Sequence, residues 1–341
     1  MFVAGGLLSS PVSLYGGAIT DRFGRRGLAI SSAVASTAGY AILFACVQLN
    51  LPVLFIAAAV IGSSVPTNMQ YVVIQTIVTD VSQESQRLSA FSLVRILSNA
   101  GIGSGLIASG LAWNYDPSIF FIVPVLLGII DVLLFIKYIP ESHSTAERVK
   151  TEISFSRDRF LVYISLVMTF SFVLANQFEN SAFPIYMSSH NGFPTLLITV
   201  LYAVNTLVVI FLQYAINALS TKIGIVRAFA SGILLYAAAD LVFATVSYYY
   251  LIVAAVVVLT LGENMMSPVG QTIIARIAPE EKRGSYFGTY SAISGVGFTF
   301  SPMIGTTLLQ TFSATPEVMW YVLALACLVM SIVSSHALRE K

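Results

Sequence analysis

The sequence predicts an all-α membrane protein built from two similar halves, and three observations lead to this fold class. Of its 341 residues, 57% are hydrophobic and only 10% are charged, which leaves too few polar side chains to cover a water-soluble globule. Apolar runs of about 20 residues recur along the whole chain, the length that a helix needs to cross a bilayer. A segment of the first half is also repeated in the second half.

Eleven apolar runs are expected to form spanning helices. Most connectors between them are short, so neighbouring helices should pack antiparallel. The first run lacks a basic start and leads directly into a charged connector, which favours a spanning helix over a cleavable signal. In order, the runs cover residues 1–19, 27–48, 51–78, 88–112, 118–139, 159–187, 194–219, 226–246, 249–275, 285–310 and 317–338.

One connector is long and polar, "PESHSTAERVKTEISFSRD" at residues 140–158. We interpret it as a linker between an N-terminal membrane domain, residues 1–139, and a C-terminal membrane domain, residues 159–341. All of the 17 Lys and Arg residues except Arg95 fall on one side when the eleven helices alternate. Because basic loops stay in the cytoplasm, we expect a multi-pass protein of the cell (plasma) membrane with a cytoplasmic linker and C-terminus.

The internal repeat joins residues 68–101 to residues 264–297. A shift of 196 positions aligns the two segments without a gap, and twelve of 34 positions are identical. Each copy spans the end of one helix, a loop and the next helix, so the halves share one orientation. Six helices separate the copies. A complete duplicated molecule would therefore have twelve helices, and we expect the first of them to lie upstream of Met1, missing from this chain.

The connector "GAITDRFGRR" gives the first family resemblance. It matches the pattern G-x-x-x-D-[RK]-x-G-[RK]-[RK] that is typical of the major facilitator superfamily between its second and third helices, and the repeat and linker agree with that family. The resemblance implies the major facilitator fold, with two pseudo-symmetric six-helix halves and eleven of twelve helices present. The matching residues are Gly17, Asp21, Arg22, Gly24, Arg25 and Arg26. The second half keeps only "STKIGIVR", with Lys222 and Gly224 but no aspartate.

The resemblance implies a secondary active transporter and not an enzyme. The segment "RLSAFSLVRILSNAGIGSGLIASG" resembles the helix-5 sequence of efflux-type members, which favours proton-coupled export of amphipathic compounds. The sequence "IPES" after residue 138 is similar to text in sugar porters, so a proton-coupled symporter that imports a sugar or another metabolite is the alternative. A non-transporting scaffold or receptor relative is a third class. The expected partners are a small-molecule substrate, protons and the lipid bilayer, with no nucleic acid, and we expect a monomer.

Asp21 is expected to act in gating. An aspartate at a helix end can accept N–H bonds from the start of a neighbouring helix, an interaction typically worth about 0.3–1 kcal/mol. The resemblance implies that this loop meets the start of the helix near Ser285 in the outward-facing state. Arg22, Arg25 and Arg26 would hold the loop at the anionic leaflet. Alternatively, the charged residues only anchor the topology.

Charged residues inside the apolar runs are the other site candidates, because a charge at mid-bilayer normally faces a cavity or a partner. The resemblance implies that Asp131 and Asp240 lie on flanking helices and are structural. Arg95 either lies at cavity depth, with an unassigned acidic partner, or reaches toward the cytoplasm. Glu263 is a candidate for proton coupling. The expected cavity residues are Asn68, Arg95, Asn176, Gln177, Asn180 and Asn264.

Glu179, in "FVLANQFENSAFPIY", is the second candidate for proton coupling. On a continuous helix it would share one face with Asn176, Asn180 and Phe183, and Pro184 would allow the helix to bend. A carboxyl group there could bind and release a proton as the cavity closes and opens. It could also be solvated near the outer end, or bind a cationic substrate directly.

No cofactor or metal is expected. The three histidines, His143, His190 and His336, lack metal-ligand spacing, and both cysteines fall inside apolar runs. The glycines of "NAGIGSG" precede no lysine, so they favour close helix packing over nucleotide binding.

Overall fold

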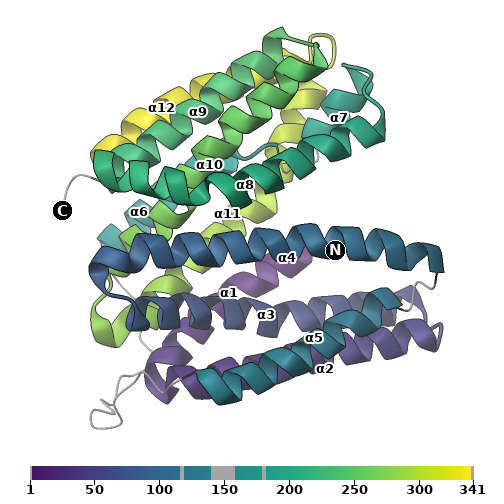
Figure 1. Ribbon diagram of the computed structural model, residues 1–341, viewed down its shortest axis with the longest axis vertical. Helices are drawn as coiled ribbons and strands as arrows, with labels where there is room; N and C mark the ends of the chain where they lie inside the picture. Colours follow the sequence, from purple (N-terminus) through teal and green to yellow (C-terminus); the bar gives the residue numbers. More distant parts are fainter. Residues whose placement is uncertain (1, 116–118, 140–157, 179–181, 339–341) are drawn as a thin grey trace. The chain divides into compact units, whose positions relative to one another are not determined.

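The computed structural model describes residues 2–115, 119–139, 158–178 and 182–338. Those residues form helices joined by short connections and contain no strand (Figure 1). Ten of the eleven apolar runs are single α-helices, with ends within a few residues of the predicted ones. They are α1 (Phe2–Phe23), α2 (Arg25–Gln48), α3 (Val53–Val81), α4 (Arg87–Tyr115), α5 (Ile119–Tyr138), α8 (Thr195–Ile223), α9 (Ile225–Thr245), α10 (Tyr249–Ile277), α11 (Arg283–Thr311) and α12 (Val318–Ala337).

The remaining run, residues 159–187, was predicted as one helix, and this prediction is wrong. Helix α6 (Arg159–Ala175) ends before a turn at residues 176–178, and α7 (Ala182–Ser189) begins after it. Pro184 lies in the first turn of α7, where no N–H group is needed within the helix. A continuous helix would bring its ring against the carbonyl group of the preceding turn. The face that was expected to join Asn176 to Phe183 therefore does not exist.

The internal repeat is visible in the helix bounds. Helices α3 and α10 each have 29 residues, as do α4 and α11. A 3₁₀ turn separates the helices of each pair, η1 (Glu84–Gln86) in the first copy and η3 (Glu280–Lys282) in the second. All of these bounds differ by the same 196 positions that align the sequences. The duplicated sequence therefore encodes duplicated local structure, including its turns.

The chain forms two compact units, each containing residues from both sequence halves. The first unit comprises residues 1–84, 104–162 and 274–296. Within it, α2 packs against α3 and α5, and α1 packs against α3 (Figure 1). The second unit comprises residues 85–103, 163–273 and 297–341. These units group the residues differently from a single division at the linker, so the domain limits given above remain a prediction.

In the second unit, α9 packs along α12 and also contacts α8 (Figure 1). An aromatic cluster forms part of its core, where the rings of Phe183, Phe243 and Trp320 lie 5.1–6.1 Å apart between centroids. Edge-to-face packing of this kind stabilises the core beyond simple burial. Tyr186 adds a fourth ring against Trp320 and donates a hydrogen bond to the Phe243 carbonyl oxygen.

The helix surfaces are apolar, as expected for a protein in hydrocarbon. Among the described residues, seven helical segments are long and apolar enough to cross a membrane. Large apolar side chains point outward from them, including Leu54, which is 77% exposed, and Phe211, which is 74% exposed. Exposed apolar surface on this scale would be unfavourable in water.

Candidate functional site

A buried ion pair forms the centre of a polar site in the second unit. The Arg95 guanidinium of α4 lies 2.6 Å from the Glu263 carboxylate of α10, and both side chains are largely buried. Arg95 Nε also donates to the Gln213 side-chain oxygen of α8 at 3.1 Å. The acidic partner that the sequence left unassigned for Arg95 is therefore Glu263.

Amide side chains complete this arrangement. Asn205 Nδ2 of α8 donates to Glu263 Oε2 and to Thr260 Oγ1, each at 3.0 Å. Gln213 Nε2 donates to the backbone carbonyl group of Asn264. We call Arg95, Asn205, Gln213, Thr260 and Glu263 the Glu263 network. Because a buried charge is costly unless it is paired and hydrogen-bonded, these partners account for the two charges inside an apolar helix bundle.

Asn264 follows Glu263 in α10, and its backbone carbonyl group accepts from Gln213. The residue is only 1% exposed, and neither its amide nitrogen nor its side-chain oxygen has a hydrogen-bond partner among the described residues. A buried amide without a partner costs about 1–3 kcal/mol. The assignment of Asn264 to the cavity remains a prediction.

The sequence analysis missed Asn205 and Gln213. Both lie on the buried face of α8, which also contains Ile198, Leu201 and Val209. A usable signal was present, since Asn205, Gln213 and Asn217 are separated by eight and four residues and so share one helical face. Amide side chains aligned along one face of a spanning helix indicate a polar interface.

A second polar cluster lies in the first unit around Asp21, at the end of α1. Its carboxylate accepts hydrogen bonds from the backbone N–H of Gly284 at 2.8 Å and of Ser285 at 2.7 Å, and from the Ser285 hydroxyl at 2.6 Å. Gly284 and Ser285 form the first turn of α11, where N–H groups have no partner within the helix. The carboxylate therefore caps α11, as the sequence predicted.

Asp80 extends this cluster, although the sequence analysis did not identify it. Its carboxylate pairs with Arg25 Nε at 3.0 Å and with Arg283 Nη1 at 2.7 Å. We call Asp21, Arg25, Asp80, Arg283 and Ser285 the Asp21 cluster. Arg25 is only 1% exposed, so the expectation that it faces lipid headgroups is wrong. Its guanidinium is instead held by two carboxylates, with Asp21 at 3.7 Å.

The other motif residues have distinct roles. A Cβ atom on Gly17 would overlap the carbonyl oxygen of Gly284 and lie 2.9 Å from the Gly288 Cα, so α1 and α11 touch through their backbones. Gly24 joins α1 to α2 with a φ of 95°, a conformation that favours glycine. Arg22 is exposed, and Arg26 donates to the Ile136 carbonyl oxygen at the end of α5.

The second unit contains a related contact. Asn217 Nδ2 of α8 donates to the Ser89 hydroxyl of α4 at 2.9 Å, and Ser89 is the repeat equivalent of Ser285. In the second copy of the repeat the serine hydroxyl donates to a carboxylate, and in the first copy it accepts from a carboxamide. The negative charge that caps a helix start is specific to the first unit.

The remaining predicted cavity residues are found elsewhere or lie outside the described part of the chain. Asn68 lies in the first unit and donates to the Ser64 carbonyl oxygen of its own helix. Gln177 is fully buried and donates to the Ser301 hydroxyl of α11, and Asn176 is buried in the turn after α6. Glu179 and Asn180 lie outside the described residues. Within the described ranges, no group of His, Cys, Asp or Glu side chains could hold a metal ion.

Comparison with known proteins agrees with this architecture. The family model for the Major Facilitator Superfamily matches residues 1–178 and again residues 165–341. The chain is 22% identical over 297 residues to the tetracycline resistance protein, class B, of Escherichia coli, covering 84% of this chain and 73% of that protein. It is 24% identical over 336 residues to the Na(+), Li(+), K(+)/H(+) antiporter of Planococcus maritimus, covering 87% and 78% respectively.

Solved structures share the fold. The human organic anion transporter MFSD10 (TETRAN) matches with a TM-score of 0.80 at 13% identity, over 97% of this chain and 82% of that chain. At this identity the likeness concerns the fold alone. The family match over both halves identifies the chain as a member of the Major Facilitator Superfamily, a multi-pass membrane protein that acts as a secondary transporter and not as an enzyme.

Proposed function

We propose that this transporter exports an amphipathic compound in exchange for protons, by alternating access, and that Glu263 is a coupling carboxylate. The observation that carries this proposal is the buried pair between Arg95 and Glu263, 2.6 Å apart. An ionisable pair within spanning helices is expensive and normally serves function. The named activities of the two relatives, tetracycline resistance and cation/proton antiport, support the export direction.

The network suggests how a proton and a substrate could compete. When Glu263 is ionised, Arg95 forms an ion pair with its Oε1 and Asn205 donates a hydrogen bond to its Oε2. Protonation removes the negative charge and weakens the ion pair, while Gln213 continues to accept from Arg95. A cationic substrate would pair with the ionised carboxylate and would be released when Glu263 takes up a proton. The amide of Asn264 would add a hydrogen bond to the substrate.

In this proposal, the inward proton gradient drives export. The membrane potential contributes about 2.3 kcal/mol per 100 mV for each net charge moved inward, so exchange of one proton for one monovalent cation is driven by the pH difference alone. The Asp21 cluster closes the cytoplasmic end in one state and opens in the other. The protein would act in the plasma membrane with its linker and C-terminus in the cytoplasm. Glu179 remains a second predicted coupling residue, and import of a sugar or other metabolite with protons remains the alternative function.

Transport assays in proteoliposomes test the coupling. A growth-protection screen against dyes, antibiotics and lipophilic cations would first supply a substrate, and protection against several unrelated cations favours export. With an imposed pH gradient, Glu263→Gln should abolish gradient-driven accumulation while substrate exchange without a gradient continues. Glu179→Gln would be assayed in parallel, since loss of accumulation there alone would move the coupling role to Glu179.

Two controls make the result specific. Glu84→Gln neutralises a carboxylate whose side chain is 69% exposed, and it should leave accumulation unchanged. The double variant Arg95→Gln/Glu263→Gln removes both buried charges, so it separates loss of coupling from damage by an unpaired arginine. Gradient-driven accumulation at the wild-type rate in Glu263→Gln would refute the coupling role. Accumulation of one sugar driven by inward protons would replace export by the symport alternative.

A further inference from the structure

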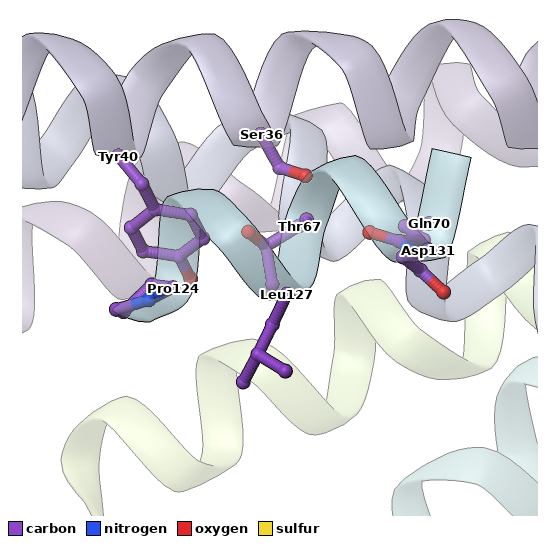
Figure 2. Close-up of a pocket in the computed structure, with 8 residues that line it drawn as sticks. Ser36, Tyr40, Thr67, Gln70, Pro124, Leu127 and Asp131 are labelled. Carbon is purple, nitrogen blue, oxygen red and sulfur yellow. The ribbon is translucent and has the colours of Figure 1, made fainter. Parts of the chain in front are cut away.

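A separate pocket lies in the first unit, between α2, α3 and α5. Its volume is about 410 Å³, which falls in the range of roughly 300–1,000 Å³ found for small-molecule sites. Figure 2 shows its lining, with Ser36 and Tyr40 from α2, Gln70 from α3, and Leu127 and Asp131 from α5. We call this cavity the flank pocket. Its full lining is Ser36, Tyr40, Thr67, Gln70, Pro124, Leu127, Gly128 and Asp131.

The carboxylate in the flank pocket has only a neutral partner. Asp131 Oδ2 accepts a hydrogen bond from Gln70 Nε2 at 2.6 Å, and the two side chains lie together at one end of the view in Figure 2. In the part of the chain that the structure describes, no basic side chain forms an ion pair with Asp131. This contrasts with the Glu263 network, where an arginine balances the buried acid.

Asp131 lies inside an apolar helix, where a carboxylate normally needs a partner of opposite charge or a cavity. The residue lies within the spanning helix α5, more than halfway along Ile119–Tyr138. A carboxylate at the centre of such a helix costs about 3 kcal/mol on insertion scales and normally faces a cavity or a partner. Here it faces a cavity. A cation bound in the flank pocket would supply an opposite charge, which no described side chain provides in an ion pair.

The rest of the lining fits an amphipathic molecule. Leu127 is 59% exposed and, with Pro124 and the Tyr40 ring, offers apolar contact toward the other end of the pocket (Figure 2). Gln70 supplies a polar group at the carboxylate, and the hydroxyl groups of Ser36 and Thr67, which donate within their own helices, add polar lining. A Cβ atom on Gly128 would overlap the Thr37 hydroxyl, so α2 and α5 approach closely there and close the pocket on one side.

We propose that the flank pocket binds an ammonium group attached to an apolar body, with Asp131 as the counter-ion. The site shares no residue with the Glu263 network and lies in the other unit, so it does not depend on the proposed coupling mechanism. The same chemistry occurs in hydrophobic amine compounds and in the headgroup of phosphatidylethanolamine. The proposal gives Asp131 a role in binding, whereas the sequence analysis expected a structural one.

Photo-crosslinking of the purified protein in phosphatidylcholine nanodiscs tests this site. The probe is dodecylamine with a diazirine in its chain, and the matched neutral probe is the corresponding dodecanol. Mass spectrometry should place amine adducts on peptides of α2 and α5 around Tyr40 and Leu127. Asp131→Asn should lower this labelling by about tenfold, since a charge-assisted hydrogen bond is worth roughly 1.5–3 kcal/mol and 1.4 kcal/mol corresponds to tenfold.

A second pair of variants tests the cavity without changing the charge. Leu127→Trp fills the flank pocket and should reduce amine labelling, whereas Leu126→Trp makes the same change at an exposed residue that does not line the pocket and should not. Added phosphatidylethanolamine will compete with the amine if the lipid headgroup is the natural ligand and will have no effect if a free amine is. Equal labelling by both probes, or unchanged labelling in Asp131→Asn, overturns the proposal.

Discussion

At the scale of single residues, three acidic side chains in the helices have three different kinds of partner. Glu263 is paired with an arginine and hydrogen-bonded by an amide. Asp21 is neutralised mainly by the N–H groups at a helix start and lies 3.7 Å from Arg25. Among the described residues, Asp131 pairs with the amide of Gln70. Asp21 and Glu263 are buried whereas Asp131 is partly exposed, so the two acids with several partners are also the two that lose more contact with the surroundings of the protein.

The Glu263 pair gives a prediction about stability. Glu263→Gln leaves the Arg95 guanidinium buried without its counter-ion, and breaking a buried pair in this way costs about 3–5 kcal/mol. The double variant Arg95→Gln/Glu263→Gln should therefore be more stable than Glu263→Gln alone. Thermal unfolding in detergent measures the difference.

The exposed pair of Arg276 and Glu84, 3.7 Å apart, provides the matched control. Its coupling energy in the same double-mutant cycle should stay within about 1 kcal/mol. If the double variant at Arg95 and Glu263 lost as much stability as the two single changes added together, the two residues would not be coupled.

At the scale of helices, the contact between α1 and α11 depends on the absence of side chains. Gly17, Gly284 and Gly288 bring the two backbones together, which places Asp21 one turn further along α1 within hydrogen-bond distance of the first turn of α11. Gly17 and Asp21 of the motif therefore act together: Gly17 allows α11 to approach α1, and Asp21 accepts hydrogen bonds from the start of α11. Small residues at a crossing point are a common way to pack membrane helices closely.

Gly17→Ala is therefore expected to destabilise the protein. The added methyl group would overlap the Gly284 carbonyl oxygen, a backbone atom that cannot rotate away, and overpacking of this kind costs about 1–3 kcal/mol. Gly27→Ala is the matched control in the same motif region, because a Cβ atom there meets nothing within 4 Å. Melting temperatures of the two variants should differ clearly. Equal melting temperatures would mean that α1 and α11 are not in backbone contact.

At the scale of the whole molecule, the two copies of the repeat have helices of equal length, but equivalent residues have different partners. The hairpins of α3 with α4 and of α10 with α11 match in length and turn, yet Ser285 meets the Asp21 carboxylate whereas Ser89 meets the Asn217 amide. The Asp21 carboxylate accepts hydrogen bonds from the helix start, whereas the Asn217 amide donates one to the serine hydroxyl, and hydrogen bonds to a charged acceptor are the stronger kind. We infer that this difference between the two copies allows the Asp21 cluster to stabilise one conformation of the transport cycle over the other.

Asp21→Asn should shift the conformational balance toward the inward-facing state, because the variant loses the charged acceptor for three donors. Spin labels at Gln83→Cys and Lys222→Cys, which are exposed positions of the first and second unit, would report longer distances by double electron–electron resonance. The buried Cys46 and Cys327 would be replaced by serine. Glu281→Gln is the control for charge loss nearby, and identical distributions in Asp21→Asn and wild type would rule out the gating role.

Much of the fold could be predicted from the sequence because the signals are local. Hydropathy located the helices, and the repeat predicted equal hairpins in both halves. The prediction failed at residues 159–187, where hydropathy stays high but α6 ends at Ala175 and residues 176–178 form a turn. Average hydropathy is insensitive to a single backbone break. The family resemblance implied the contact of Asp21 with the start of α11, and the unpaired N–H groups at a helix start explain why an aspartate is bound there.

The sequence by itself determined the fold class, ten of the eleven helix positions and the duplication, and its family resemblance implied the Asp21 contact. Only the tertiary structure decided that Arg95 pairs with Glu263, that Asn205 and Gln213 hold them, that Asp80 binds both Arg25 and Arg283, and that Asp131 faces a pocket. The physical reason is that hydropathy and periodicity depend on neighbours along one helix. Which charges meet depends instead on how each helix is rotated and packed against helices distant in the chain.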